Sequence, residues 1–170
     1  MVRTFTKGEQ SAFSNLLDAK GNYTLLFTVE APKQIMVGKL GLGTFPAGIY
    51  AYTGSAFGRG SSSLGGRILR HIKKDKKKRW HIDYLLSDYD VHLTTAVVGV
   101  LSKKLECVVN KGLKEAFRAR IPFLGFGSSD CTERCDSHLL FFGHARDVVE
   151  RTVELYEAKA DCGVFVFKFA

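Results

Sequence analysis

Three polar side chains occur at spacings that suit chemistry on a phosphate group. Arg67 and His71 are four residues apart, so a helix through them would place both on one face. They follow a glycine-rich stretch, and backbone N–H groups at a helix start attract anions. Glu106 falls on an otherwise apolar stripe that continues through Val109 and Leu113, where a carboxylate needs a basic partner or a metal ion. A solvated helix face and a paired carboxylate at the core edge would also explain these residues.

Aromatic residues provide a second group of candidates. Tyr50 and Tyr52 are two residues apart in a stretch typical of a strand, so both would project from one face of a sheet. They could line a site or simply pack in the core. Trp80 follows a basic run and could stack on a nucleic-acid base, although such a residue more often packs a helix onto the core. His81 and Asp83 come directly after it and could join a site or hold a loop.

Cysteine and histidine residues indicate a possible zinc site. Cys131, Cys135 and His138 could supply three ligands, with Cys107 or Cys162 as the fourth. The alternative is a polar loop with partly buried thiols. The first 13 residues contain no apolar run of the kind that a secretory signal needs, so we expect a cytoplasmic protein in which thiols are free or metal-bound rather than paired in disulfides.

The positive charge of the chain is concentrated in one segment. Its net charge is +8, and residues 59–79 alone carry nine basic side chains and one acidic one, so the rest of the chain is neutral overall. Charge focused in this way favours an anionic partner, nucleic acid above all. No amphipathic apolar stripe accompanies the lysines, which argues against a membrane surface. The candidate contacts are Arg59, Arg70, Lys73, Lys74, Lys76, Lys77, Lys78, Arg79 and Trp80.

The pattern of apolar residues predicts a single α+β domain over residues 1–170, with a small mixed or antiparallel sheet flanked by helices. The chain is 45% apolar, and its longest apolar run, 96–101, is far shorter than the roughly 20 residues of a membrane span. We expect strands over 23–30, 34–40, 49–53, 91–101, 139–142 and 164–169. We expect helices over 7–18, 64–72, 80–86, 102–118 and 146–159, the fourth capped by Ser102, and a loop over 120–136.

Taken together, these residues resemble the GIY-YIG nuclease superfamily. Tyr52-Thr53-Gly54 looks like its Tyr-x-Gly element, Arg67 like its helix arginine and Glu106 like its metal-binding glutamate. Gly48-Ile49-Tyr50 spells the opening motif, but it lies on the same expected strand as Tyr52, whereas the family places its two motifs on separate antiparallel strands. Gly21-Asn22-Tyr23 is therefore the better counterpart.

The chain is more closely similar to an uncharacterised branch of that superfamily. The segments that carry this likeness are Gly48 to Ala56, Trp80 to Leu85, Glu106-Cys107, Gly125 to Cys131 and Ser137-His138-Leu139. The likeness implies a GIY-YIG-like core over about 21–142, preceded by segment 1–20 and followed by a helix–strand extension over 143–170. Some relatives are joined to endonuclease III-type DNA glycosylases, which suggests DNA repair.

The resemblance implies metal-dependent hydrolysis of phosphodiester bonds in nucleic acid, with DNA favoured over RNA. Glu106 would hold Mg²⁺ or Mn²⁺, and Arg67 would bind the scissile phosphate. Tyr23 or Tyr52 would position or deprotonate the attacking water, with His71 as the rival base. Accessory candidates are Tyr50, Gly54, Ser55, His81, Asp130 and His138. Two alternatives remain open: a non-catalytic nucleic-acid-binding module on the same fold, and a zinc-stabilised interaction domain.

Overall fold

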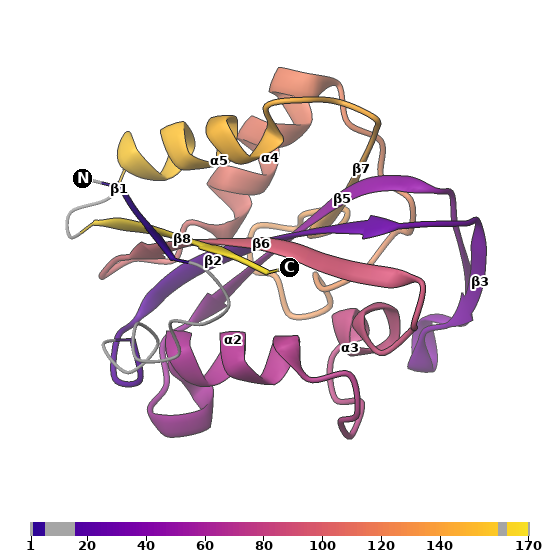
Figure 1. Cartoon of the computed structure of the whole chain (residues 1–170), viewed down its shortest axis with the longest axis horizontal. Coiled ribbons are helices and arrows are strands. Elements are labelled where there is room, and N and C mark those ends of the chain that lie inside the picture. The colour runs from indigo at the N-terminus through magenta and orange to yellow at the C-terminus, as the bar shows by residue number, and fades with distance from the viewer. Residues whose placement is uncertain (1, 6–15, 160–162, 170) are drawn as a thin grey trace.

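The computed structural model describes residues 2–5, 16–159 and 163–169, and its strands and helices confirm the α+β class (Figure 1). The strands are β1 Val2–Phe5, β2 Gly21–Val29, β3 Lys33–Met36, β4 Leu42–Phe45, β5 Gly48–Ala56, β6 Val91–Val100, β7 Leu139–Gly143 and β8 Val164–Lys168. The helices are α2 Leu64–Ile72, α3 His81–Leu86, α4 Glu106–Phe117 and α5 Val148–Glu157, with 3₁₀ turns at Gly38–Leu40 and Gly60–Ser62.

Six of these strands form one mixed sheet in the order β1-β8-β6-β2-β5-β7. β1 and β8 pair in parallel, and the other neighbours pair antiparallel. β6 lies inside the sheet, as its apolar residues on both faces predict. β8, from the segment expected to be an extension, pairs with β6 in this same sheet. β3 and β4 form a separate two-stranded hairpin.

Helices cover both faces of the large sheet (Figure 1). Tyr23, Leu25 and Phe27 of β2 pack with α2 and α3, whereas Leu26 packs with α4 and α5. This division follows from the alternation of side chains along a strand. The first core is continued by Leu64 and Ile68 of α2 and the second by Val109 and Leu113 of α4. A site built on β2 and α2 is therefore supported by buried core residues of both elements.

Several expected boundaries were wrong or incomplete. The stretch 34–40 is not one strand, because β3 ends at Met36 and a 3₁₀ turn follows. The sequence reasoning also missed β1 and β4. Ser102 does not cap α4, which begins at Glu106 after Leu105. The helix expected over 7–18 lies largely outside the described residues. Within the described part of the chain, no helix combines the length and apolarity needed to span a lipid bilayer.

Candidate functional site

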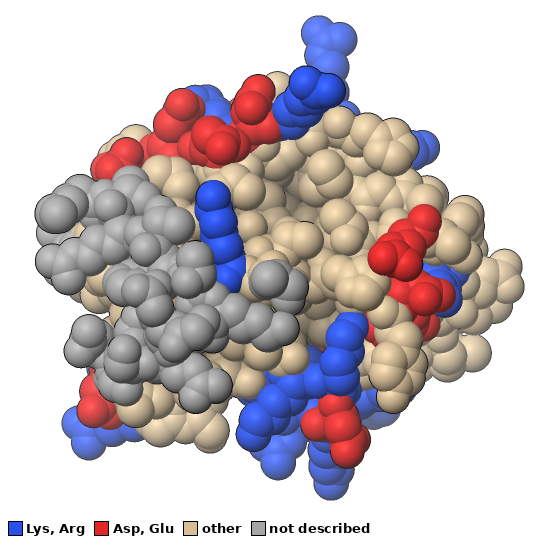
Figure 2. All heavy atoms as spheres, in the orientation of Figure 1, with Lys and Arg blue, Asp and Glu red and all other residues tan. Residues whose placement is uncertain are grey.

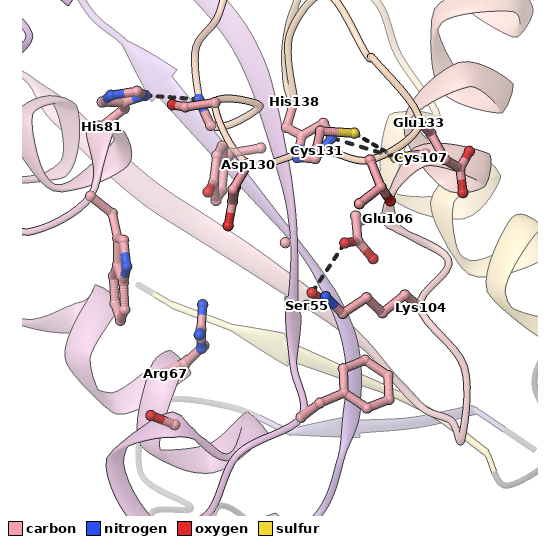
Figure 3. A pocket seen from close by; sticks show the side chains of 18 of the residues that line it. Ser55, Arg67, His81, Lys104, Glu106, Cys107, Asp130, Cys131, Glu133 and His138 are labelled. Carbon is pink, nitrogen blue, oxygen red and sulfur yellow. Dashed lines mark hydrogen bonds between the residues drawn. The ribbon is translucent and has the colours of Figure 1, made fainter. Parts of the chain in front are cut away.

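A cavity of about 620 Å³ opens at one end of β5, between α2 and the start of α4. Its wall combines residues from four parts of the chain: Tyr52 and Ser55 on β5, Arg67 on α2, Glu106 on α4, and Asp130 and His138 on the long loop. Figure 3 shows Arg67, Asp130 and Glu106 directed into it from different sides. The folding of β5, α2 and α4 thus brings most of the predicted site residues to one place.

A buried tyrosine–histidine pair connects β2 to α2. The hydroxyl of Tyr23 lies 3.0 Å from Nε2 of His71, and both side chains are almost fully buried. Gly54 pairs with Tyr23 across the strands, and a Cβ there would lie 2.7 Å from the Tyr23 hydroxyl. The glycine at this position therefore makes room for the tyrosine ring.

Burial sets the protonation of this pair. Burial raises the pKa of Tyr23 even though the Arg67 guanidinium lowers it. The lowering effect of Arg67 on this pKa is thus outweighed by burial. Burial and the nearby Lys76 lower the pKa of His71 to about 3. The pair is therefore neutral near pH 7, with Tyr23 protonated and the His71 ring uncharged.

The other two tyrosines point to the same side of β5 but have different surroundings. Tyr52 lines the cavity, with its ring edge against Phe126, and burial raises the pKa of its hydroxyl. Tyr50 lies in the core, where it stacks on Phe27 and donates a 2.6 Å hydrogen bond to the carbonyl of Pro46. The geometry therefore places Tyr52 at the cavity and gives Tyr50 a packing role.

Arg67 is held against Trp80. The guanidinium carbon of Arg67 is 4.7 Å from the centre of the Trp80 ring, within the range of a cation–π contact. Its Nε is buried without a hydrogen-bond partner among the described residues. Arg70 makes a second such contact, at 4.9 Å. Trp80 therefore packs against the core and two arginines, and Arg67 keeps unused hydrogen-bonding capacity beside the cavity.

The carboxylate of Asp83 gathers part of the basic segment. One of its oxygens accepts hydrogen bonds from Nη2 of Arg70 at 2.7 Å and from the backbone N–H groups of Arg79 and Trp80 at 2.9 and 3.0 Å. The ammonium of Lys76, whose side chain is 3% exposed, lies 3.9 Å from the other oxygen. Burial alone would raise the pKa of Asp83, but these hydrogen bonds hold it below its usual value.

The predicted nucleic-acid contacts consequently divide into two groups. Arg70 and Lys76 are tied to Asp83, and Nζ of Lys74 donates to the carbonyls of Asp88 and Val91. The exposed members are Arg59, Lys73, Lys77, Lys78 and Arg79, of which Arg79 also lines the cavity. Figure 2 shows basic side chains gathered over the segment between α2 and α3, on the opposite edge of the molecule from the acidic side chains of α5.

Glu106 stands at the first position of α4. Its Oε1 accepts a 3.2 Å hydrogen bond from Ser55, and its Oε2 is buried without a hydrogen-bond partner among the described residues. The turn before it is fixed by the buried Asn22, which donates to the carbonyl of Lys103 at 2.9 Å and accepts from the N–H of Leu105 at 3.0 Å. Ser55 therefore holds one carboxylate oxygen of Glu106, and the other has no hydrogen-bond partner that would compete with a ligand.

His81 links α3 to the long loop. Its Nδ1 accepts a 2.9 Å hydrogen bond from the backbone N–H of Gly127, so its Nε2 carries the proton in the neutral ring. Burial lowers the pKa of His81, although the negative charge of Asp130 opposes this. Asp130 itself is exposed at the cavity mouth.

Three cysteines and one histidine converge beside Glu106. The sulfurs of Cys107, Cys131 and Cys135 and a ring nitrogen of His138 all lie within 4.8 Å of one another. The Cys107 sulfur is 3.3 Å from that of Cys131 and 3.6 Å from Nε2 of His138. This group could hold a metal ion such as zinc. Of the two fourth ligands considered, Cys107 is in place, and Cys162 lies outside the described residues.

Comparison with known proteins identifies a family. The family described as a domain of unknown function, DUF123, matches residues 22–160. The chain belongs to this DUF123 family. No curated protein and no solved structure matches the chain. The DUF123 match includes every candidate site residue from Tyr23 to His138, but the description of the family includes no activity, so the likeness to GIY-YIG nucleases stays a prediction.

Two residues at the site of this DUF123 protein were missed from the sequence. Asn22 was read only as part of a motif, and the contacts that it makes 81 and 83 residues away have no local signature. Lys104, exposed at the cavity, lies just before the start of α4, and no motif in the sequence singled it out. The role of Asp83 had a signal, since an acid at the third position of a helix commonly accepts from the backbone N–H groups before it.

Proposed function

We propose that this protein is a metal-dependent endonuclease of the GIY-YIG type, acting on DNA in preference to RNA. The observation that carries the proposal is the cavity itself, which both Arg67 and Glu106 line, while Oε2 of Glu106 has no hydrogen-bond partner among the described residues. A cationic group for a phosphate and a carboxylate for a metal ion are what phosphodiester hydrolysis requires on one surface.

The strand arrangement supports the likeness to that superfamily. Its two motifs are expected on neighbouring antiparallel strands, and β2 and β5 are such a pair, with Tyr23 directly opposite Gly54. α2, which carries Arg67 and His71, follows β5, and α4, which carries Glu106, follows β6. The opening motif is therefore best assigned to Gly21-Asn22-Tyr23, and the literal Gly48-Ile49-Tyr50 lies on the partner strand.

Each side chain then has a definite task. Arg67 binds the scissile phosphate and stabilises the negative charge that builds up on it. Trp80 keeps the guanidinium in place through the 4.7 Å contact. The hydroxyls of Tyr52 and Tyr23 stay protonated, because burial raises the pKa of both. Neither therefore acts as a tyrosinate base. Tyr52, which lines the cavity, orients the attacking water by hydrogen bonding, and the buried Tyr23 supports α2 through its contact with His71.

Glu106 fits a divalent cation such as Mg²⁺ or Mn²⁺. Mg²⁺ is typically bound through one or two carboxylates together with water and substrate phosphate oxygens, and Glu106 has one unpaired carboxylate oxygen and lines the same cavity as Arg67. When bound, the cation would neutralise charge on the leaving oxygen. Ser55 holds the other carboxylate oxygen and thereby fixes the direction of Glu106.

A cleavage assay tests the proposal. Wild-type protein, Arg67→Ala and Glu106→Gln would be incubated with single-stranded, duplex, flapped and abasic DNA and with RNA, in Mg²⁺, Mn²⁺ or EDTA. We expect metal-dependent cutting that falls at least about 100-fold in both variants, because each removes transition-state stabilisation of roughly 3 kcal/mol or more. Lys39→Gln, an exposed lysine of the 3₁₀ turn, is the control and should cut normally.

Measuring binding as well as cutting, on the same substrates, separates the alternatives. Salt-sensitive binding without cutting, equal in the wild type and Glu106→Gln, would indicate a binding module that keeps the fold. Neither binding nor cutting on any substrate would contradict both nucleic-acid proposals and leave the zinc-stabilised interaction domain.

A further inference from the structure

We propose that Cys107, Cys131, Cys135 and His138 form a closed, structural zinc centre that holds one wall of the cavity in place. This inference concerns the architecture of the protein and does not depend on the proposed nuclease activity. The four ligands come from two segments that are separate in the sequence: Cys107 from the first turn of α4, and the other three from the loop before β7.

The distances suit tetrahedral zinc. With zinc–sulfur and zinc–nitrogen bonds of about 2.3 and 2.0–2.1 Å, two sulfurs lie about 3.8 Å apart and a sulfur and a nitrogen about 3.6 Å apart. The Cys107 sulfur and His138 Nε2 are 3.6 Å apart, and the Cys107 and Cys131 sulfurs are 3.3 Å apart. The latter separation is well beyond the roughly 2.05 Å of a disulfide bond, and the three thiols are free. Since all four ligand atoms lie within 4.8 Å of one another, shifts of about 1 Å or less would complete the centre.

The backbone already holds the ligands in position. The N–H of His138 donates to the carbonyl of Phe126 at 2.8 Å, and its carbonyl accepts from Thr53 at 3.0 Å. The side chain of Asn110, in α4, donates to the carbonyl of Ser137 at 2.8 Å. Arg134 adopts a left-handed conformation (φ 53°), and this turn brings Cys131 and Cys135 to the same point. A site organised before binding loses little entropy when the metal arrives.

The ligand count distinguishes a structural role from a catalytic one. Catalytic zinc keeps a coordination position for water or substrate, whereas four protein ligands fill a tetrahedral ion. The centre would join α4 to the loop at Cys107, the residue next to Glu106. Figure 3 shows Cys107, Cys131 and His138 directly beside Glu106 at the cavity. Zinc would thus fix both the start of α4 and the loop that carries Asp130.

The chain contains a built-in reporter of this centre. Arg134 is exposed between the two cysteine ligands, and residues 121–138 contain no other lysine or arginine. Within residues 121–138, trypsin can therefore cut only after Arg134. Zinc bound by Cys131 and Cys135, on either side of Arg134, would prevent the local unfolding that trypsin needs to cut the bond after Arg134. Removing the zinc would make that bond accessible.

The test uses purified, reduced protein and no nucleic acid. We expect one zinc per chain by elemental analysis, and Co²⁺ in its place should give the visible absorption of a thiolate-bound tetrahedral ion. Cutting after Arg134, followed by mass spectrometry, should be roughly tenfold faster or more after chelation and in Cys135→Ser. Thr132→Ala, which lies between the ligands in the same loop, is the matched control and should keep its zinc and its protection.

Three results would overturn the proposal: folded wild-type protein with far less than one zinc and no Co²⁺ spectrum, full zinc content in Cys135→Ser, or equal cutting with and without chelator. If the variant does not fold, chelation and Co²⁺ exchange on the wild type give the decision. Cleavage of nucleic acid without zinc would contradict this inference alone, and a zinc centre without cleavage would contradict the nuclease proposal alone.

Discussion

His71 illustrates how burial decides the chemistry that a single residue can perform. Its ring is 1% exposed, its Nε2 contacts Tyr23, and its Nδ1 has no hydrogen-bond partner among the described residues. Lys76, Arg67 and Arg70 add positive charge around it, and only Asp83 opposes them. Because the charged ring is so disfavoured, His71 is a neutral partner that orients Tyr23 and a poor proton acceptor for water.

This burial predicts a pH-dependent stability. The pKa of His71 falls from 6.5 to about 3 on folding, so below pH 6.5 the unfolded chain binds a proton that the folded protein excludes. Stability is therefore complete above pH 6.5 and decreases as the pH falls towards 3. His71→Gln removes the titrating group, so the unfolding free energy of the variant should not show this pH dependence. The difference in unfolding free energy between wild type and variant should therefore shrink by about 1.4 kcal/mol for each unit that the pH falls between about pH 6 and 4.

Urea denaturation of both proteins at pH 7, 6, 5 and 4 measures this difference. His144→Gln, at an exposed histidine after β7, is the matched control, and its difference from the wild type should stay within about 0.5 kcal/mol. A difference for His71→Gln that is constant with pH would show that the ring becomes charged in the folded protein.

At the scale of elements, one carboxylate organises the connection between α2 and α3. Asp83, at 0% exposure, binds Arg70 of α2, approaches Lys76 of the connecting loop and accepts from two N–H groups at the start of α3. Replacing it by Asn should cost about 3–5 kcal/mol of unfolding free energy, since Arg70 and Lys76 would lose their buried counter-charge.

Chemical denaturation measures this cost, provided that the far-UV circular dichroism spectrum shows the variant to be folded without denaturant. Asp75→Asn, in the same loop but exposed, should change stability by less than about 0.5 kcal/mol. If the two variants were equally stable, the ion pairs would make no net contribution and the basic loop would be held by packing alone.

The elements that the sequence predicts well are those with strong local patterns. β2, β5 and β6 are runs rich in aromatic, β-branched and other apolar residues, and α2 has apolar residues at helical spacing, with the hydroxyl of Ser63 accepting from the N–H of Gly66 at its start. The start of α4 was misplaced because its turn is held by Asn22 of β2, a partner 83 residues away from Leu105. β4 was missed because Leu42-Gly43-Thr44-Phe45 is short and pairs only with β3.

The candidate site was partly predictable for the same reason. Helical spacing placed Arg67 and His71 on one face, and both are at the site, but with different surroundings: Arg67 lines the cavity and His71 lies buried beneath it. Local spacing carries no information about burial, so it did not show that Arg70 and Lys76 are tied to Asp83. It also left Cys107 and Cys162 as equal choices for the fourth ligand, because that choice depends on how α4 packs against the loop.

At the scale of the whole molecule, the charge that attracts nucleic acid should be smaller than the sequence total implies. Lys74 and Lys76 bind the protein's own carbonyls, and Arg70 and Lys76 also face Asp83. The exposed lysines of this segment that can contact phosphates are Lys73, Lys77 and Lys78, of which Lys78 also lies over the ring of Tyr84. Since each phosphate contact releases counterions, these three should account for most of the salt dependence that the segment provides.

A salt titration measures that share. If the proposed interaction with duplex DNA is correct, replacing Lys73, Lys77 and Lys78 together by Gln should reduce the slope of log affinity against log salt by about 0.9 per lysine. Binding would be followed by fluorescence anisotropy in EDTA, so that no substrate is cut. The matched control replaces Lys39, Arg146 and Lys168, which are exposed on other elements, and removes the same net charge. Equal slopes for the two triple variants would show that overall charge attracts the nucleic acid, whereas a loss confined to the first would place the phosphate backbone along the segment between α2 and α3.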